Sequence, residues 1–412
     1  MSYSPMSSIC SRREAATRWS DRKILALEQL PKSPHEWSPV IRDFLTLIEE
    51  DPVLCINFRQ MFEQIPDQSP YNKDPTGKSQ VRDYKLMLGL FNHIITCAPE
   101  WEDNHMVGFP IDTILNWPMN TPAGQVVFSD SRVNAHLKKM FDVWAEFLSS
   151  KESTYVLTKD DGGWLNPVAI PSHFERTFIC DPSDPHYGFQ SWDDFFTRRF
   201  RVGVRPVADP NNDSVITSAC ESSVSRISHN AQRKEKFWLK GQPYSLEDMF
   251  NHDPFTHLFV GGTVYQGYLN ATSYHRWHSP VNGVVIKIVH IPGTYYLVCP
   301  ATGFGSEDGP DVSSPDKSES YISHTATRVL VFLESDNPRI GLMCFIAIGM
   351  AEVSTCQAVV SEGTRVRKGD ELGMFHFGGS THCLIFRSET KLNFAVGTGD
   401  RVLLNEKLAR VS

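Results

Sequence analysis

The chain has 412 residues, of which 41% are hydrophobic and 21% charged, a composition typical of globular proteins with room for two or three domains. Its formal charge of −8 argues against a nucleic-acid-binding protein, and no apolar run reaches the roughly 18 residues of a transmembrane helix. Nine cysteines occur singly and the N-terminus has no apolar signal segment, so the sequence predicts a cytoplasmic protein with free thiols.

The first third of the chain is predicted to be helical, because its apolar residues recur three and four positions apart. This spacing is typical of helices that bury one face in a core. The residues that follow it are Ile41, Phe44, Leu45 and Ile48; Tyr84, Met87, Leu88, Phe91 and Ile95; and Val133, Leu137, Met140, Phe141, Trp144 and Leu148.

After about residue 205, short β-branched and aromatic runs between turn residues predict strands. The runs are Val284–Ile291, Val329–Leu333, Cys344–Ile348 and Gln357–Val360. Ala301–Ser320 holds almost no apolar side chains, which predicts a solvated loop, with a lid over a pocket as the alternative. We therefore expect an α+β protein in which a helical N-terminal region packs on a β-rich C-terminal domain.

Three segments concentrate reactive side chains, namely Ala219–Ser225, Ser273–Gly283 and Phe375–His382. The third contains Ser380 after two glycines. It does not fit a nucleophile elbow, because G-x-S-x-G requires a second glycine and a following helix, whereas the next residues read as a strand. A plain glycine turn between two strands is another interpretation.

A further interpretation is that Ser380 attacks its own chain. Gly379 leaves the carbonyl carbon before Ser380 sterically open and gives the backbone unusual freedom. Once a base removes the Ser380 hydroxyl proton, Oγ can attack the Gly379 carbonyl and convert the amide into an ester. Elimination and hydrolysis then release ammonia and leave a pyruvoyl group at residue 380.

His275 and His278 are candidates for the base, and Glu221 is a candidate for the carboxylate that orients a histidine. The spacing of the two histidines fits a helix, but the preceding apolar run and Pro280 fit a strand or turn equally well. Paired histidines also suggest a metal site, with His376 or Glu221 as a further ligand, although no spacing here is diagnostic of one.

Together the three segments resemble the phosphatidylserine decarboxylases, which are pyruvoyl enzymes made by self-cleavage before a serine. The Leu-Gly-Ser-Thr of that family corresponds to Gly378–Thr381, its D-Y-H-R-x-H-x-P stretch to Ser273–Pro280, and its F-x-x-F-F-x-R segment, with one extra residue, to Phe189–Arg198. Further stretches that match the family, in consistent order, are Lys240–Phe250, Ile291–Tyr296 and Val366–Thr381.

The chain resembles one branch of this family more closely, the soluble fungal L-tryptophan decarboxylases of the psilocybin-pathway type. Two departures from the wider family concern acids. Glu221 stands where an aspartate is usual, and Ser273 stands where an acid often precedes the tyrosine. The N-terminal stretches that resemble this branch are Asp51–Ile65, Met119–Gly124, Phe147–Ser153 and Gly162–Asn166.

The resemblance implies a proenzyme that cuts itself into a large chain of residues 1–379 and a small chain of residues 380–412, which stay together as a heterodimer. It implies that His275 deprotonates Ser380, oriented by Glu221, and that His275 or His278 returns a proton to the product. The pyruvoyl group on Ser380 would take the electron-sink role that pyridoxal phosphate has elsewhere, so no pyridoxal phosphate is expected. The implied domains are a helical region of residues 1–175 and a catalytic domain of residues 176–412.

The expected substrate is an aromatic L-amino acid, with L-tryptophan converted to tryptamine and CO2. Trp277, Phe375 and Phe377 flank the reactive segments and would line an apolar pocket for the ring. Phosphatidylserine is the alternative substrate, although the net negative charge does not favour a membrane-docking surface. The alternative of another class is an uncleaved, non-catalytic or metal-binding relative. No metal, nucleic acid or stable membrane insertion is expected.

Overall fold

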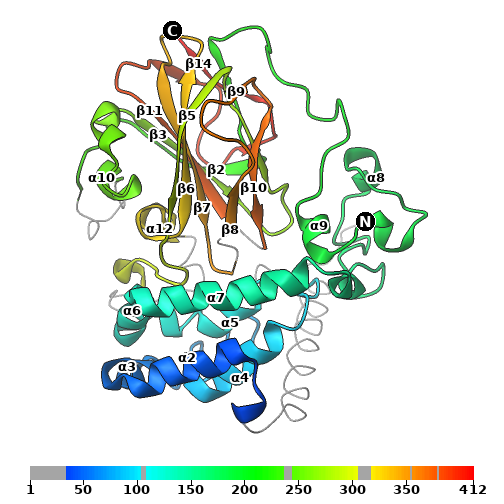
Figure 1. The fold of residues 1–412 in the computed structure, drawn as a ribbon, viewed down its shortest axis with the longest axis vertical. Coiled ribbons are helices and arrows are strands. Elements are labelled where there is room, and N and C mark those ends of the chain that lie inside the picture. The colour runs from blue at the N-terminus through cyan, green and yellow to red at the C-terminus, as the bar shows by residue number, and fades with distance from the viewer. Residues whose placement is uncertain (1–33, 104–107, 236–243, 305–316, 353–354, 378–379) are drawn as a thin grey trace, which may run out of the picture. The chain divides into compact units, whose positions relative to one another are not determined.

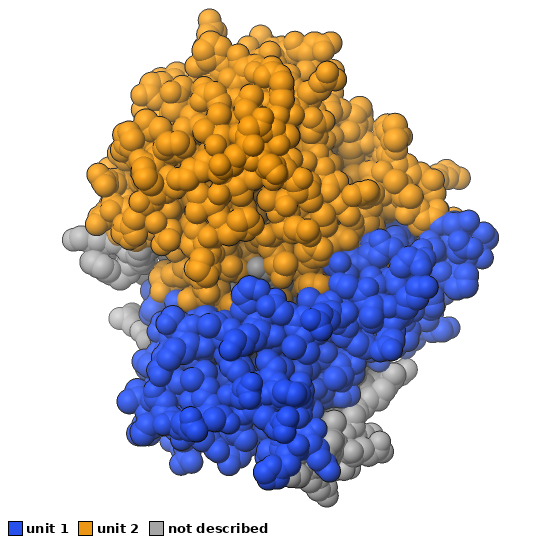
Figure 2. Space-filling view, in the orientation of Figure 1, with its two compact units in different colours: residues 1–174, 181–194, 296–315 blue, residues 175–180, 195–295, 316–412 orange. Residues whose placement is uncertain are grey.

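The computed structural model describes residues 34–103, 108–235, 244–304, 317–352, 355–377 and 380–412. The chain forms two compact units, which Figure 2 distinguishes by colour. The first comprises residues 1–174, 181–194 and 296–315, and the second comprises residues 175–180, 195–295 and 316–412. None of the described helices combines the length and the apolarity that a membrane crossing requires.

The first unit is helical, as the apolar spacing predicts. The three predicted stripes lie on α2, α4 and α7, with Ile95 directly after the end of α4, and all their residues are buried except the half-buried Leu45. The described elements of this unit are η1 Pro34–Glu36, α2 Pro39–Glu50, α3 Pro52–Glu63, α4 Tyr84–Ile94, α5 Pro110–Leu115, η2 Pro118–Asn120, α6 Pro122–Ser129, α7 Ser131–Leu148, η3 Lys151–Val156, η4 Pro185–Gly188 and η6 Pro300–Thr302. The short helices α8 Phe174–Thr177 and α9 Trp192–Phe196 lie where the chain changes unit.

Aspartate caps explain where two of these helices begin. The Asp51 carboxylate accepts hydrogen bonds from the backbone N–H groups of Val53 and Leu54 at the start of α3. Asp83 does the same at the start of α4. These N–H groups have no partner within the helix, so a side-chain acceptor at this position stabilises the helix by about 1 kcal/mol.

The second unit is built on an eight-stranded antiparallel sheet in the order β13-β2-β3-β11-β7-β6-β5-β9 (Figure 1). Two three-stranded sheets, β1-β14-β12 and β4-β10-β8, belong to the same unit. The strands are β1 Val215–Thr217, β2 Ser222–Ser228, β3 Thr263–Leu269, β4 Arg276–His278, β5 Gly283–Ile291, β6 Arg328–Ser335, β7 Leu342–Gly349, β8 Thr355–Ala358, β9 Arg365–Val366, β10 Glu371–His376, β11 Ser380–Phe386, β12 Leu392–Phe394, β13 Arg401–Val402 and β14 Lys407–Val411. The described helices are α10 Leu246–Met249, η5 Pro254–Phe259 and α12 Glu319–Thr325.

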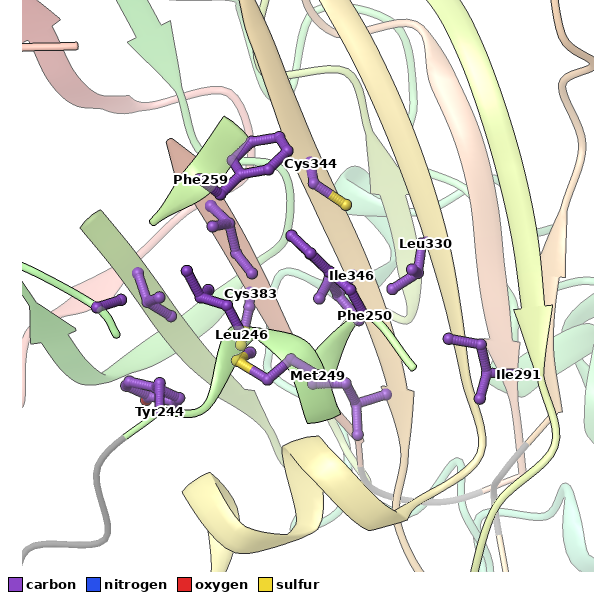
Figure 3. Close-up of a cluster of buried hydrophobic side chains, with 14 of the residues drawn as sticks. Tyr244, Leu246, Met249, Phe250, Phe259, Ile291, Leu330, Cys344, Ile346 and Cys383 are labelled. Carbon is purple, nitrogen blue, oxygen red and sulfur yellow. The ribbon is translucent and has the colours of Figure 1, made fainter. Parts of the chain in front are cut away.

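One face of the large sheet carries the apolar core of this unit. Cys383 and Ile385 of β11 lie on this face with apolar residues of β3, β6 and β7. Residues of α10, η5 and α12 join them in one buried cluster, of which Figure 3 shows a part. The large apolar area removed from water here makes this face a main source of stability.

A polar network on the same face fixes the start of β11. The Gln266 amide is almost fully buried in β3 and donates to the hydroxyls of Ser323 and Thr381, at 3.0 and 3.1 Å. The Tyr244 hydroxyl donates to the Gln266 carbonyl oxygen. Thr381 in turn donates to the Gly267 carbonyl. Gln266 therefore holds the residue that directly follows Ser380.

The observed architecture confirms the predicted α+β class and the four predicted strands, with two local differences. The last of these strands, β8, ends at Ala358 and not at Val360. The loop expected at Ala301–Ser320 lies largely outside the described residues. At its end the expectation is wrong, because Glu319 and Ser320 begin α12 and Ser320 is buried there.

We expect replacement of Gln266 by leucine to destabilise the second unit by roughly 2–4 kcal/mol, because it leaves the buried hydroxyls of Tyr244, Ser323 and Thr381 without the amide. Calorimetry should show a fall of several degrees in Tm. The control is Gln232→Leu, because the Gln232 amide donates to Asn230 at an exposed position. Equal shifts in both variants would contradict the assigned role of the network.

Candidate active site

Ser380 opens β11, the strand at the middle of the large sheet. Its partners across the two neighbouring strands are Leu269 of β3 and Gly349 of β7. The side chain is fully buried, and its Oγ makes no hydrogen bond with any described residue. Gly378 and Gly379 lie outside the described residues. A buried hydroxyl without a partner is rare in folded proteins and marks a position to explain by chemistry.

His275 lies beside the segment that leads to Ser380. Its carbonyl accepts a hydrogen bond from the Phe375 N–H, which joins the start of β4 to β10. The chain then runs from β10 through Phe377 toward Ser380. The His275 ring is fully buried and stacks on Phe196, with ring centroids 4.0 Å apart.

Trp277 shows which way His275 points. His275 directly precedes β4, and residues two apart on extended backbone share a face, so we infer that the side chains of His275 and Trp277 lie on the same side. Trp277 stacks on Phe345 of β7, with centroids 4.9 Å apart. Phe345 pairs with Leu384 of β11 and so lies on the same face of the large sheet as Ser380. His275 is therefore directed toward the face that carries the Ser380 hydroxyl.

His278 occupies the other side of β4, because it is three residues from His275 on extended backbone. Its Nδ1 lies 2.8 Å from the Gly369 carbonyl, and its Nε2 lies 3.1 Å from the Tyr274 hydroxyl. Burial lowers the pKa of His278, which favours the neutral ring at pH 7. The structure thus separates the two histidines, and both nitrogens of His278 have partners.

Glu221 is held by an arginine. Its two carboxylate oxygens accept from Nε and Nη2 of Arg205, at 2.9 and 3.0 Å. The Arg205 guanidinium also lies over the Phe200 ring, which stacks on Tyr274. The Ala219 carbonyl accepts from the His278 N–H, which brings the turn that carries Glu221 beside β4. The sequence predicts Glu221 as the orienting acid but does not predict its partner Arg205.

Arg198 fixes the turn that precedes His275. Its Nη2 donates to the carbonyls of Thr272 and Ser273, at 2.7 and 3.1 Å. Burial lowers the pKa of Arg198 to about 10, so the side chain stays charged at pH 7. Sequence reasoning identified the aromatic segment that contains Arg198 but not this role. The sequence feature that could have indicated this role is the position of Arg198 inside a strongly aromatic run.

The three aromatic residues expected to line a substrate pocket are all buried. Trp277 and Phe375 have no exposed surface, and Phe377 is 6% exposed with a left-handed φ of 66°. Trp277 packs on the backbone of Gly373, where an added Cβ would come within 2.3 Å of the indole. Trp277 and Phe375 therefore form part of the interior beside His275. His376 is bonded to Gln357 through Nε2.

Comparison with known proteins places the two parts of the chain in one family. Residues 38–172 and residues 192–410 each match a family model described as phosphatidylserine decarboxylase. An L-tryptophan decarboxylase of Psilocybe cubensis is 41% identical over 390 residues, which cover 90% of this chain and 85% of the relative.

Two further relatives show the breadth of the similarity. Decarboxylase iboD of Amanita muscaria is 40% identical over 348 residues, which cover 78% of this chain and 99% of the relative. The phosphatidylserine decarboxylase proenzyme of Clostridium novyi is 26% identical over 279 residues, which cover 68% of this chain and 83% of the relative. On these matches the chain is a decarboxylase and belongs to the phosphatidylserine decarboxylase family.

Proposed function

We propose that this decarboxylase cuts its own chain between Gly379 and Ser380, and that it then acts on an aromatic L-amino acid, converting L-tryptophan to tryptamine and CO2. The observation that carries the proposal is the Ser380 hydroxyl. It is fully buried, has no hydrogen bond to a described residue, and lies at the start of a central strand. These surroundings support a serine whose hydroxyl acts as a nucleophile.

The cut requires only groups of this chain and one water molecule. His275 accepts the Ser380 hydroxyl proton, and Oγ attacks the Gly379 carbonyl carbon. The bond between that carbon and the Ser380 nitrogen breaks, the nitrogen takes up the proton, and the amide becomes an ester. Loss of the Ser380 α-proton and of the Gly379 carboxylate leaves a dehydroalanine at residue 380. Water then replaces its nitrogen, ammonia departs, and the new chain begins with a pyruvoyl group. The products are a large chain of residues 1–379 and a small chain of residues 380–412.

The small chain keeps its place because its backbone is already paired. Every residue of β11 from Ser380 to Phe386 pairs with β3 on one side and with β7 on the other. β12, β13 and β14 also belong to this piece and pair with one another or with β1 and β2. These contacts support a stable heterodimer after the cut.

The pyruvoyl ketone supplies an electron sink for the carbon from which CO2 departs. Among the chain's own residues, His275 is the better proton donor to the product, because it points toward the face of residue 380. His278 instead acts as a positioning residue, since its two nitrogens bind Tyr274 and Gly369. Glu221, held by Arg205, is the acid that orients His275 in this proposal.

The choice of substrate rests on the named relatives. The Psilocybe protein that shares 41% identity over 90% of this chain is an L-tryptophan decarboxylase. Phosphatidylserine is the competing substrate, because the matching family models carry that name. We further propose that residues 1–175 form the helical region associated with this family and residues 176–412 the catalytic domain, with Trp277, Phe375 and Phe377 near the substrate ring.

Denaturing intact mass tests the cut directly. We expect two species from the wild type, one that ends at Gly379 and one that begins at residue 380 with the mass of a pyruvoyl group in place of serine. Ser380→Ala removes the attacking oxygen, so it should give a single full-length species. Ser388→Ala, a serine change in the same C-terminal piece, serves as the control and should be cut normally. A full-length mass for the wild type would refute the proposed self-cleavage.

Product analysis tests the substrate. The purified, cut enzyme should release tryptamine and CO2 from L-tryptophan at a rate that added pyridoxal phosphate does not change. Phosphatidylserine vesicles should give no phosphatidylethanolamine. Conversion of phosphatidylserine without conversion of any aromatic amino acid would replace the proposed substrate by the competing one.

Variants of the ion pair test the role of Glu221. Glu221→Gln keeps the shape of the side chain but removes its charge, so self-cleavage should slow by roughly hundredfold or more. Arg205→Gln leaves the carboxylate but removes its anchor, so cleavage should slow by about tenfold. Timed denaturing electrophoresis after cell-free synthesis measures both rates.

The control for these variants is Arg365→Gln, which removes an exposed ion pair with Asp336 and should leave the cleavage rate unchanged. If Glu221→Gln cuts as fast as the wild type, Glu221 only partners Arg205 and does not orient the base.

A further inference from the structure

Two connections between strands have their ends paired near residue 380. The first, residues 350–354, joins β7 to β8, and the second joins β10 to β11 and holds the proposed cleavage site. Gly349, just before the first connection, lies opposite Ser380, just after the second. Thr355, just after the first connection, lies opposite His376, just before the second. The strand pairing thus places both ends of the first connection beside the ends of the segment to be cut.

Glu352 stands at the middle of the first connection and is its one titratable residue. Its side chain is buried, with 2% exposed. Met350 belongs to the apolar cluster, which anchors the start of the connection. Ala351 follows with a left-handed φ of 54°, which turns the chain just before Glu352. The fold therefore holds a carboxylate out of water three residues from Gly349, the partner of Ser380.

The α-hydrogen of Ser380 points toward this side of β11. The Gly349 N–H donates to the Thr327 carbonyl at 3.0 Å, so it points away from β11. Gly349 and Ser380 are therefore a pair without hydrogen bonds between them, and in such a pair the two α-hydrogens face each other. The Ser380 α-hydrogen is thus directed at the end of β7, the strand that leads to Glu352.

The proposed self-cleavage needs two proton removals in different directions. The hydroxyl proton of Ser380 lies on one face of the large sheet, the face to which we assign His275. The α-proton lies in the plane of the sheet, on the side of β7. A general base must come within hydrogen-bond reach of the proton that it takes, and a glutamate carboxylate is a common one. Glu352 supplies a carboxylate on the side of the α-proton.

We propose that the Glu352 carboxylate removes the α-proton of Ser380 in the elimination step of self-cleavage. This assignment rests on the proposed function. As the carboxylate takes the proton, the Cα–H electron pair forms the Cα=Cβ bond, and the Cβ–Oγ bond breaks with its electrons left on the Gly379 carboxylate. The proton on Glu352 then passes to Cβ, which becomes a methyl group while the enamine becomes an imine. Water replaces the imine nitrogen, and ammonia departs.

Separate bases for the two steps predict separate defects. Glu352→Gln keeps the size of the side chain but removes the base, so formation of the pyruvoyl chain should slow by roughly hundredfold or more. The ester should still form and should accumulate. Hydroxylamine cleaves esters and leaves ordinary amides intact at neutral pH. It should therefore release from native Glu352→Gln a small chain that begins with an intact Ser380, which intact mass distinguishes from the pyruvoyl chain.

Three further variants sharpen the test. His275→Ala should give neither the pyruvoyl chain nor a hydroxylamine product, because the ester itself does not form. Glu352→Asp keeps a carboxylate and should restore part of the rate. When it is made with serine that carries deuterium at Cα, its rate should fall further, because the Cα–H bond breaks in the slow step. Glu334→Gln is the matched control, since it removes an exposed carboxylate of β6 in the same sheet and should be cut like the wild type.

The outcomes separate this assignment from the proposed function. If Glu352→Gln forms the pyruvoyl chain at the wild-type rate, Glu352 is not the base. If Glu352→Gln and Glu352→Asp give neither the pyruvoyl chain nor the ester, the residue serves ester formation or folding, which also overturns the assignment. In both cases a cut wild type leaves the proposed function standing. A wild type that is not cut overturns the proposed function and the role of Glu352 with it.

Discussion

The pairing of β11 with β3 and β7 is the constraint on which the candidate site depends. Seven consecutive residues, from Ser380 to Phe386, pair on both sides. A slip of one residue would move Ser380 and His382 to the apolar face and bring Thr381 and Cys383 to the face of His275. The register therefore determines whether the Ser380 hydroxyl or the Thr381 hydroxyl lies on the face of the sheet opposite the apolar cluster. It also means that a break before Ser380 leaves the pairing of the six following residues, Thr381 to Phe386, in place on both sides.

The two faces of β11 have different surroundings. On one face Cys383 and Ile385 belong to the apolar cluster, and Thr381 is fixed by the Gln266 network. On the other face Ser380 and His382 are buried without a hydrogen-bond partner among the described residues. Unpaired buried polar groups destabilise a fold, so they are retained only where other contacts stabilise the structure enough to offset that cost. The apolar face supplies those contacts, which leaves the opposite face available for chemistry.

Features that depend on local sequence could be predicted, and features that depend on pairing of distant strands could not. The helices and strands follow from the spacing of apolar residues, whereas the role of Ser380 stays a proposal that rests on the chemistry of a Gly-Ser bond and on the family resemblance. The spacing of His275 and His278 allowed them to be neighbours on a helix, but the structure has a strand that ends at His278 and begins directly after His275, and on extended backbone a spacing of three favours opposite sides.

Non-local pairs explain the other omissions. Arg205 reaches Glu221 across 16 positions of sequence, and no periodicity joins the two residues. Glu352 lies between the partners of Ser380 and His376 only because β7 pairs with β11 and β8 pairs with β10. Trp277 and Phe375 read equally as core or as pocket in the sequence, because apolar aromatic residues serve both purposes.

The arginines near His275 bear on the kind of substrate that the site accepts. Arg198 donates to the carbonyls of Thr272 and Ser273, Arg205 to Glu221, and Arg276 to the Thr197 carbonyl and to Glu371. These guanidinium groups are thus engaged in holding the backbone and the acid around β4. A phosphodiester headgroup would compete with those contacts for the same donors. A neutral indole ring needs none of them, which is compatible with the aromatic amino acid proposed as substrate.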